Sequence, residues 1–281
     1  MRLILLVFGL LALAAQPASA QGSLAAQVQN QLAMVVTSNS ADVGIAAIDL
    51  ATGETVSVRG TQRYPMASTM KIAVAAAYLS YVEKGERSLD EKIGGRSAAS
   101  LMRSMIVRSD NGATDLLLRN LGGPRTVHKW LEWHKVDGIR VDRTIAQLLR
   151  AKRDLYEDLD STTPLAFATF LKRLDGGDFL QSWSRNYLLK LMAETQTGSN
   201  RMKAFLPKGS VAHKTGTLNG YSSDVGYLTL PNGNRVAIAV FARGGSNRPR
   251  AIADAARAVY DGFLAVVGWP FNAAAALGSP Q

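Results

Sequence analysis

Hydrophobic positions follow strand-like spacing near both ends of the chain and helical spacing in its middle. "DVGIAAIDLATGETVSVRG" predicts two strands around the turn "ATGE", and "VAHKTGT", "SDVGYLTL" and "RVAIAVFAR" predict three more. Between Ser68 and about Ala193 the pattern is mostly helical, with stops at "LGGP" and "LDGGD". Helical patterns over Gln21 to Val36 and over "PRAIADAARAVYDGFLAVV" flank the strands. We therefore predict an α/β protein of the α+β type: an antiparallel sheet flanked by terminal helices, with a mainly helical inserted domain.

This pattern also predicts the domain boundaries. A discontinuous α/β domain takes residues 21–64 and 206–270, an all-α domain takes residues 65–205, and residues 271–281 form a tail. One segment of the helical region, "DGIRVDRTIAQLLRAKRDLYEDLDSTTP", has no regular period, although its middle, "LLRAKRDLYEDL", is alternatively a short helix. Irregular segments of this length in a compact domain are usually functional or disordered.

The first twenty residues have the pattern of an export signal. Arg2 precedes an apolar run from Leu3 to Ala15, and "ASA" at residues 18–20 offers small residues for cleavage after Ala20. The run is too short to span a bilayer, so we expect a periplasmic or secreted protein without a membrane anchor once the signal is removed. The chain has no cysteine, which excludes both a disulfide framework and a lipid anchor on cysteine.

The formal net charge of +10 changes this picture little. A positive net charge can indicate nucleic-acid binding, but export argues against such a partner. A solvated basic surface is the preferred interpretation. Attraction to anionic polymers of the cell envelope is the alternative. We expect no nucleic-acid partner and take a monomer as the default.

The stretch "MASTMKIAVAAAYL", Met66 to Leu79, predicts a helix that is apolar nearly all round and therefore buried. Ser68 and Lys71 nevertheless share one face of it, because they are three residues apart. Burial lowers the pKa of a lysine, which makes Lys71 a possible base for the Ser68 hydroxyl. The histidines offer no better base or metal site: His128 and His134 are six residues apart and lie on different sides of a helix. We expect no metal and no cofactor.

Two further motifs strengthen this interpretation. "VRSDNGATD" presents Ser109, Asp110 and Asn111 just before an apolar helix, and "VAHKTGTLNG" presents a K-T-G motif that begins at Lys214 on a predicted strand. S-x-x-K followed by S-D-N and K-T-G is the signature of class A β-lactamases and penicillin-binding proteins. From about Leu24 to Val267 the chain resembles the class A β-lactamases and, more widely, the penicillin-recognising serine enzymes.

The resemblance implies roles in forming an acyl-enzyme. Ser68 would attack the lactam or amide carbonyl, with Lys71 as proton acceptor. Ser109 would relay a proton to the departing nitrogen, and Lys214 would supply positive potential beside it. The backbone N–H groups of Ser68 and Thr217 would form the oxyanion hole.

The resemblance also implies substrate contacts and a pinned loop. Asn111 would hold Lys71 and the substrate's side-chain amide, and Thr215, Gly216 and Thr217 would line the place of the substrate carboxylate. Arg143 and Asp160 would form the salt bridge that holds the ends of the omega loop together.

The sequence departs from the family where the acyl-enzyme would be hydrolysed. Class A enzymes activate the water with a glutamate in R-x-E-x-x-L-N, but "DRTIAQLL" puts Ile145 in the glutamate's place when counted from Arg143. Counting back from Asp160 reaches Gln147, which is not a base either. Three nearby acids remain as alternatives: Asp154, Glu157 and Asp158. A fourth alternative is that Lys71 acts as the base both in forming and in hydrolysing the acyl-enzyme.

The arginine that backs the carboxylate site in the family is also not evident. Ser223 lies near its place on the strand after K-T-G, and Arg243, Arg248 or Arg250 are candidates to replace it.

Four functions therefore remain open. A serine β-lactamase with atypical or slow deacylation is the leading hypothesis. A D,D-peptidase acting on peptidoglycan-like peptides, an esterase on the same scaffold, and a non-catalytic protein trapped as its acyl form are the alternatives.

Overall fold

The computed structural model describes residues 18–152 and 154–266. The predicted tail and most of the predicted export signal lie outside these residues, so the cleavage site stays a prediction. Within the described residues no helix is both long and apolar enough to cross a membrane.

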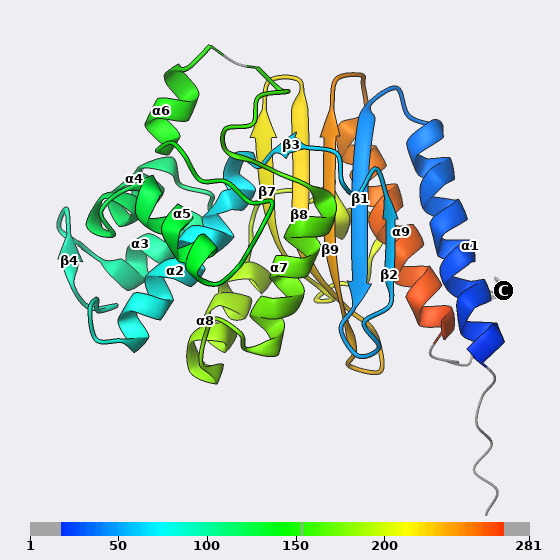
Figure 1. Ribbon diagram of the computed structural model, residues 1–281, viewed down its shortest axis with the longest axis horizontal. Coiled ribbons are helices and arrows are strands. Elements are labelled where there is room, and N and C mark those ends of the chain that lie inside the picture. Colours follow the sequence, from blue (N-terminus) through cyan, green and yellow to red (C-terminus); the bar gives the residue numbers. More distant parts are fainter. Residues whose placement is uncertain (1–17, 153, 267–281) are drawn as a thin grey trace, which may run out of the picture.

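The elements are arranged as a central sheet with helices on both sides (Figure 1). The helices are α1 (Ala18–Thr37), η1 (Ala67–Met70), α2 (Lys71–Glu83), α3 (Ala98–Val107), α4 (Asn111–Asn120), α5 (Pro124–Trp133), α6 (Ile145–Arg150), α7 (Pro164–Gly176), α8 (Ser182–Ala193), η2 (Met202–Phe205) and α9 (Arg248–Val266). The strands are β1 (Asp42–Asp49), β2 (Thr55–Val58), β3 (Tyr64–Pro65), β4 (Lys92–Ile93), β5 (Arg96–Ser97), β6 (Ser161–Thr162), β7 (Val211–Leu218), β8 (Tyr221–Thr229) and β9 (Arg235–Arg243).

The five strands predicted from the sequence form one antiparallel sheet in the order β2-β1-β9-β8-β7. β9 is buried on both faces, which explains why "RVAIAVFAR" reads as a continuous apolar run rather than an alternating one. Its Val236, Ile238 and Val240 join the core under α1 and α9, whereas Ala239 and Phe241 join the core on the helical side. The predicted fold class is confirmed.

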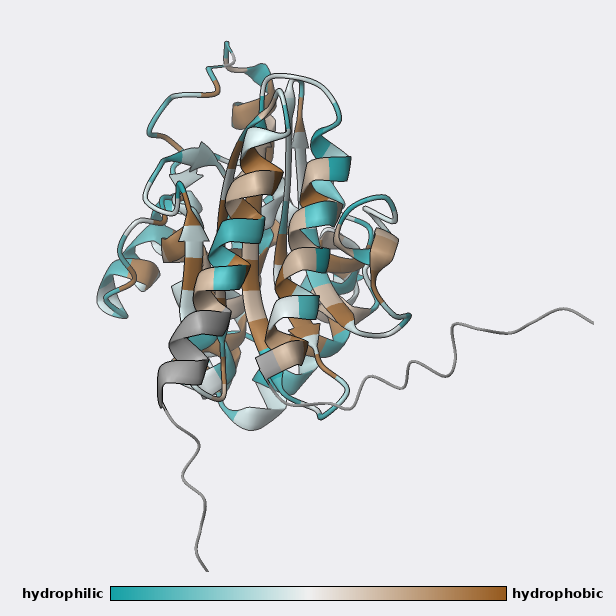
Figure 2. Ribbon diagram, turned by 90° about the vertical axis from the view of Figure 1, so that its right-hand side faces the viewer, coloured by the Kyte–Doolittle hydropathy of each residue, from teal (hydrophilic) through white to brown (hydrophobic). Residues whose placement is uncertain are grey.

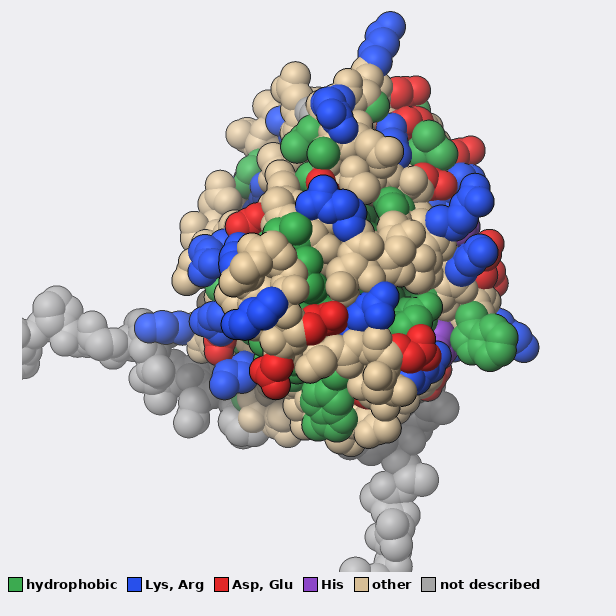
Figure 3. Space-filling model, turned by 90° about the vertical axis from the view of Figure 1, so that its left-hand side faces the viewer, with side chains coloured by type: hydrophobic (Ala, Val, Ile, Leu, Met, Phe, Trp, Pro, Cys, Tyr) green, Lys and Arg blue, Asp and Glu red, His purple; other side chains and the backbone are tan. Residues whose placement is uncertain are grey.

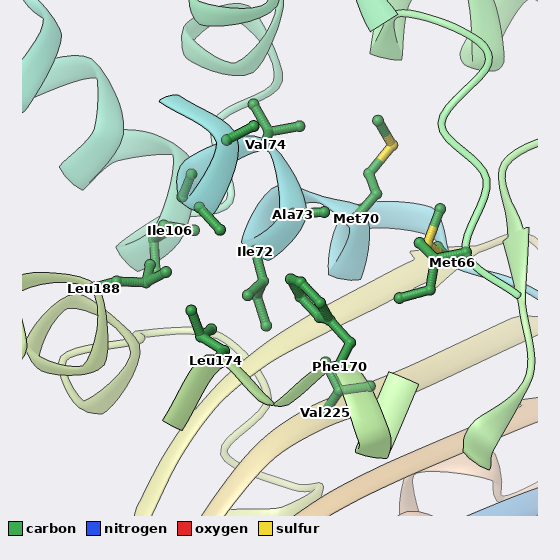
Figure 4. Packing of buried hydrophobic residues seen from close by; sticks show 14 of the residues in the cluster. Met66, Met70, Ile72, Ala73, Val74, Ile106, Phe170, Leu174, Leu188 and Val225 are labelled. Atoms are coloured by element: carbon green, nitrogen blue, oxygen red, sulfur yellow. The ribbon is translucent and has the colours of Figure 1, made fainter. Parts of the chain in front are cut away.

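The two terminal helices pack side by side across one face of the sheet (Figure 2). α7 lies against the opposite face, where it contacts β1, β8 and β9. α2 is the buried helix expected from its all-round apolar sequence, and it packs against the neighbouring helices α3, α4, α5 and α8. Ile72 of α2 points toward Phe170 and Leu174 of α7, so one core joins the helical lobe to the sheet (Figure 4).

The irregular segment contains a helix, but not where the sequence suggested. α6 spans Ile145–Arg150, so the alternative helix over "LLRAKRDLYEDL" is wrong except for its first three residues. A capping box fixes the start: Thr144 Oγ1 accepts from Gln147 N, and the Gln147 side chain accepts from Thr144 N. The short pairs β3–β6 and β4–β5 were not predicted either, because two-residue strands carry no period.

The side of the molecule formed by the helical lobe, away from α1 and α9, carries both positive and negative side chains. Figure 3 shows Lys and Arg side chains distributed over this face among Asp and Glu rather than gathered in one block. That distribution suits the interpretation of a solvated basic surface.

Arg243 at the end of β9 ties three distant segments together. Its Nε donates to Asp42 Oδ2 at 2.7 Å, and its Nη1 donates to the Leu155 carbonyl at 3.2 Å. Its guanidinium carbon also lies 4.7 Å from the centroid of the Tyr64 ring and 4.0 Å from that of Tyr156. The side chain is 6 % exposed, so these contacts are largely shielded from water.

Substituting this arginine tests the connection. Arg243→Ala leaves Asp42 without its buried partner and should lower the free energy of unfolding by about 3 kcal/mol, measured by urea denaturation. Arg250→Ala is the matched control, because the Arg250 side chain is 66 % exposed and its contacts, with Asp254 along α9 and with the Phe205 ring, lie at the surface. We expect less than about 0.5 kcal/mol for it. Equal effects of the two substitutions would contradict this account.

Candidate active site

The S-x-x-K motif lies where η1 passes into α2. Side chains at i and i+3 of a 3₁₀ turn eclipse one another, so the turn sets Ser68 and Lys71 on the same side. Ala67 has φ +50°, a left-handed conformation that alanine rarely adopts. The hydrogen bond from Met66 N to the Asp160 carbonyl, 2.9 Å, helps to hold the chain there. Ser68 is half-buried, and Lys71 is fully buried.

The Lys71 amine is surrounded by oxygen acceptors from the S-D-N motif. Its Nζ donates to the Ser109 carbonyl and to Asn111 Oδ1, both at 2.7 Å, and lies 3.3 Å from Ser109 Oγ. Burial lowers the pKa of Lys71 to about 7, and the negative charges of Asp110 and Asp115 oppose that shift. A lysine of this kind exists partly as the free amine at neutral pH, as a general base requires.

The Ser109 hydroxyl lies between two lysines. Lys214 Nζ donates to Ser109 Oγ at 2.8 Å, and Lys71 Nζ lies 3.3 Å from the same oxygen. The backbone of Ser109 has φ +58°, and Asp110 stabilises the following turn by capping α4, its Oδ1 accepting from Ala113 N at 2.8 Å. The three motifs recognised in the sequence are therefore brought together at one hydroxyl.

Lys214 is fully buried on β7 and donates a second hydrogen bond, to the Thr215 carbonyl at 2.9 Å. Burial lowers the pKa of Lys214 well below its usual value, and the nearby charge of Lys71 lowers it further. The charge of Asp224 acts in the opposite direction. Lys214 therefore carries its charge less readily than an exposed lysine does, but little water screens that charge when it is present.

Gly216 allows β7 to pack directly against η1. A Cβ atom at this position would lie 2.7 Å from the Met66 carbonyl oxygen and 3.1 Å from Ala67 Cβ. The glycine of K-T-G is therefore required by the close approach of two backbones, which places the sheet edge beside Ser68.

Arg201 backs this edge of the sheet, and sequence reasoning missed it. Its Nη1 donates to the carbonyls of Gly216 and Ser223, both at 2.8 Å, and its Nη2 donates to Thr217 Oγ1 at 2.7 Å. Arg201 is 8 % exposed. It precedes η2 in a segment with no hydrophobic period, so no local pattern announces it.

The three arginines considered from the sequence are engaged elsewhere. Arg243 is bound to Asp42, Arg248 donates to the carbonyls of Gly244 and Gly245, and Arg250 pairs with Asp254. The sequence left open which arginine, if any, lies here; in the structure Arg201 contacts the K-T-G segment of β7. Thr215 precedes Gly216 on β7, and its Oγ1 lies 2.6 Å from Thr197 Oγ1.

The ends of the omega loop are joined as the sequence suggested. Arg143 Nε donates to Asp160 Oδ2 at 2.5 Å, and Asp160 Oδ1 accepts from the backbone N–H groups of Asp142 and Arg143. Asp160 is 1 % exposed, which makes this a shielded pair with its lone pairs satisfied.

Ile145 stands at the first position of α6 and is 3 % exposed. Its N–H donates to Asp115 Oδ1 at 2.7 Å, and the N–H of Ala146 donates to Asp115 Oδ2 at 2.9 Å. Asp115, a second residue that the sequence reading overlooked, therefore fixes the start of α6 against α4. The side chain at this position is a hydrocarbon and cannot accept a proton.

The acids considered as replacements have other partners. Glu157 accepts from Arg143 Nη2 at 2.5 Å, Asp158 lies 3.5 Å from Arg63, and Asp154 accepts from Tyr156 N at 2.8 Å. In the part of the chain that the structure describes, no hydrogen bond joins these acids to Ser68 or Lys71. Gln147 caps its own helix, as described above.

The histidines do not enter this site directly. His128 lies 3.4 Å from Glu132 on α5, and His134 packs against Trp130 and Phe179. His213 is a fully buried residue of β7. Across residues 18–152 and 154–266 there is no group of three or more potential metal ligands.

Comparison with known proteins identifies the class. The model of the β-lactamase enzyme family matches residues 26–263. β-Lactamase VEB-1 of Pseudomonas aeruginosa is 30% identical over 74% of this chain and 79% of its own length. A β-lactamase of Streptomyces fradiae is 32% identical over 82% of each chain. The crystal structure of TLA-3 extended-spectrum β-lactamase superposes with a TM-score of 0.79 at 29% identity, over 85% of this chain and 99% of the other.

The chain therefore belongs to the β-lactamase enzyme family. Within that family its relatives and its fold are those of the class A enzymes, which act on small-molecule β-lactams.

Proposed function

We propose that this protein opens the β-lactam amide through an acyl-enzyme on Ser68 and that it hydrolyses the acyl-enzyme slowly. The observation that supports the first half is the Ser109 hydroxyl within hydrogen-bond reach of both Lys71 and Lys214. The observation that carries the second is the hydrocarbon side chain at Ile145.

Each group has a role that its surroundings support. Ser68 attacks the lactam carbonyl while Lys71, with a pKa of about 7, accepts the hydroxyl proton. Ser109 passes a proton to the departing nitrogen, and Lys214 stabilises negative charge that develops there. The backbone N–H groups of Ser68 and Thr217 bind the carbonyl oxygen as it becomes an oxyanion.

The negatively charged carboxylate of the substrate binds at the edge of β7. Thr215 and Thr217 donate to the carboxylate beside Gly216, and the charge of Arg201 behind them favours an anion. Asn111, which already accepts from Lys71, contacts the substrate's side-chain amide.

Deacylation lacks a positioned base. Losing a general base costs about 10²- to 10⁴-fold in rate, which corresponds to about 3–5 kcal/mol of barrier. The protein we propose is a β-lactamase that turns over slowly, and an acyl-trapping protein or a D,D-peptidase on peptidoglycan-like peptides is the second candidate. We further propose that it acts as a monomer in the periplasm or outside the cell, after cleavage of the export signal.

Intact mass spectrometry during incubation with benzylpenicillin tests the proposal. The wild type should gain one benzylpenicillin mass while free drug is consumed slowly, and Ser68→Ala should gain none, because it lacks the nucleophile. Absence of any adduct together with an unchanged drug would refute acylation at Ser68. A permanent adduct without turnover would favour the acyl-trapping candidate.

Introducing a carboxylate at position 145 tests the proposal that hydrolysis of the acyl-enzyme is slow for lack of a base. Ile145→Glu should accelerate deacylation by about 10²- to 10⁴-fold, because it places a base at the start of α6. Ile145→Gln is the matched control: it has the same size and polarity but cannot accept a proton, and it should leave deacylation slow. The decay of the adduct mass in a chase without drug measures both. Similar rates in the two variants would show that the missing carboxylate is not the cause.

The pH dependence of acylation tests the role of Lys71. Only the uncharged amine accepts a proton, so the acylation rate constant should rise with pH, reach half its maximum near pH 7 and level off above. Lys71→Arg, which stays charged across this range, should lose most of the rate and the inflection. A flat wild-type profile between pH 6 and 9 would exclude Lys71 as the base.

A further inference from the structure

A wholly buried histidine–aspartate pair lies on β7 and β8, the two strands at one edge of the sheet. His213 Nδ1 is 2.8 Å from Asp224 Oδ1 and 2.9 Å from Asp224 Oδ2, and both side chains are 0 % exposed. His213 immediately precedes Lys214 on β7, and Asp224 on β8 stands directly opposite Thr215 in the strand register. The proposed acylation mechanism uses neither residue.

The pair also fastens the segment that carries Arg201. Thr195 Oγ1 donates to the His213 carbonyl at 2.7 Å, and Met202 N donates to Asp224 Oδ2 at 3.3 Å. Arg201 lies between these two attachments. The first attachment uses only the backbone of His213, so the pair reaches the segment through the Asp224 carboxylate, which His213 Nδ1 holds in place beside Met202 N.

Asp224 also balances charge in this region. Its negative charge raises the pKa of Lys214, Arg201 and Lys203, whereas burial lowers the pKa of each of these groups. Among the residues that the structure describes, His213 Nε2 has no hydrogen-bond partner, so the ring's polar contact is with Asp224 alone. A substitution that removes Nδ1 therefore isolates this one contact.

We propose that His213 and Asp224 are positioning residues that hold Arg201 and Thr215 in place for the carboxylate of the substrate. This inference rests on the proposed function, because it presumes acylation by a carboxylate-bearing β-lactam. The two residues touch no substrate; they act through the groups that do. Their loss should weaken recognition of the carboxylate specifically and leave the chemistry at Ser68 intact.

Benzylpenicillin and its methyl ester test this, because they differ only at the carboxylate, which the ester replaces by an uncharged group. Acylation rate constants are measured by intact mass on the wild type, His213→Leu and His213→Asn. His213→Leu, which removes the bond to Asp224, should slow acylation by benzylpenicillin about 10- to 100-fold while changing acylation by the ester less than about threefold. His213→Asn should recover most of the rate, since its amide N–H can replace Nδ1. Asp224→Asn keeps the size of the side chain and should shift the selectivity between the two compounds in the same direction as His213→Leu, while it also removes the charge that raises the pKa of Lys214.

A general loss of structure would slow both compounds equally, and that result would overturn the inference. So would unchanged selectivity between the two compounds in all three variants. If the wild type is acylated by neither compound, the proposed function fails; if it is acylated and prefers benzylpenicillin, only the variants decide on the positioning role.

Discussion

Two lysine side chains, Lys71 and Lys214, are buried within reach of the same hydroxyl, that of Ser109, and most of the surrounding structure is needed to keep them there. Moving an ammonium group out of water is costly unless oxygen atoms replace its hydration. The S-D-N loop supplies those atoms through the Ser109 carbonyl and Asn111, and β7 supplies the Thr215 carbonyl. The cost that remains is expressed as lowered pKa values, which is the property that makes a lysine useful as a base.

This requirement explains why the site is assembled from three separate parts of the chain. η1 and the first residue of α2 carry Ser68 and Lys71, the loop before α4 comes from the helical lobe, and β7 comes from the edge of the sheet. Gly216 lets the edge approach η1 closely enough for all three to meet. The groups that we propose as catalytic therefore depend on how the lobe packs against the sheet, and Ile72 and Phe170 lie in that joint core (Figure 4).

Much of this could be predicted from the sequence, for reasons that differ between residues. The strands and the buried helix followed from hydrophobic spacing, and Ser68, Lys71, Ser109 and Lys214 followed from motifs whose chemistry is specific. Arg201, Asp115 and the His213–Asp224 pair could not be found in that way. Each acts through partners distant in the chain or on another strand, and a single charged residue has no period to reveal its burial. The start of α6 was misplaced because its capping box and Asp115 outweigh the weak helical signal of the residues that follow.

The two halves of the proposed reaction depend on different parts of this framework. Acylation uses groups fixed by α2, the loop before α4 and the sheet, all of which carry the residues that their chemistry needs. Deacylation depends on the omega loop, and here the backbone is held as firmly as elsewhere: Arg143 and Asp160 join its ends, and Asp115 fixes the first residues of α6. These contacts set the position of residue 145, so the slow hydrolysis that we propose follows from its side chain alone: an isoleucine is a hydrocarbon and cannot activate water.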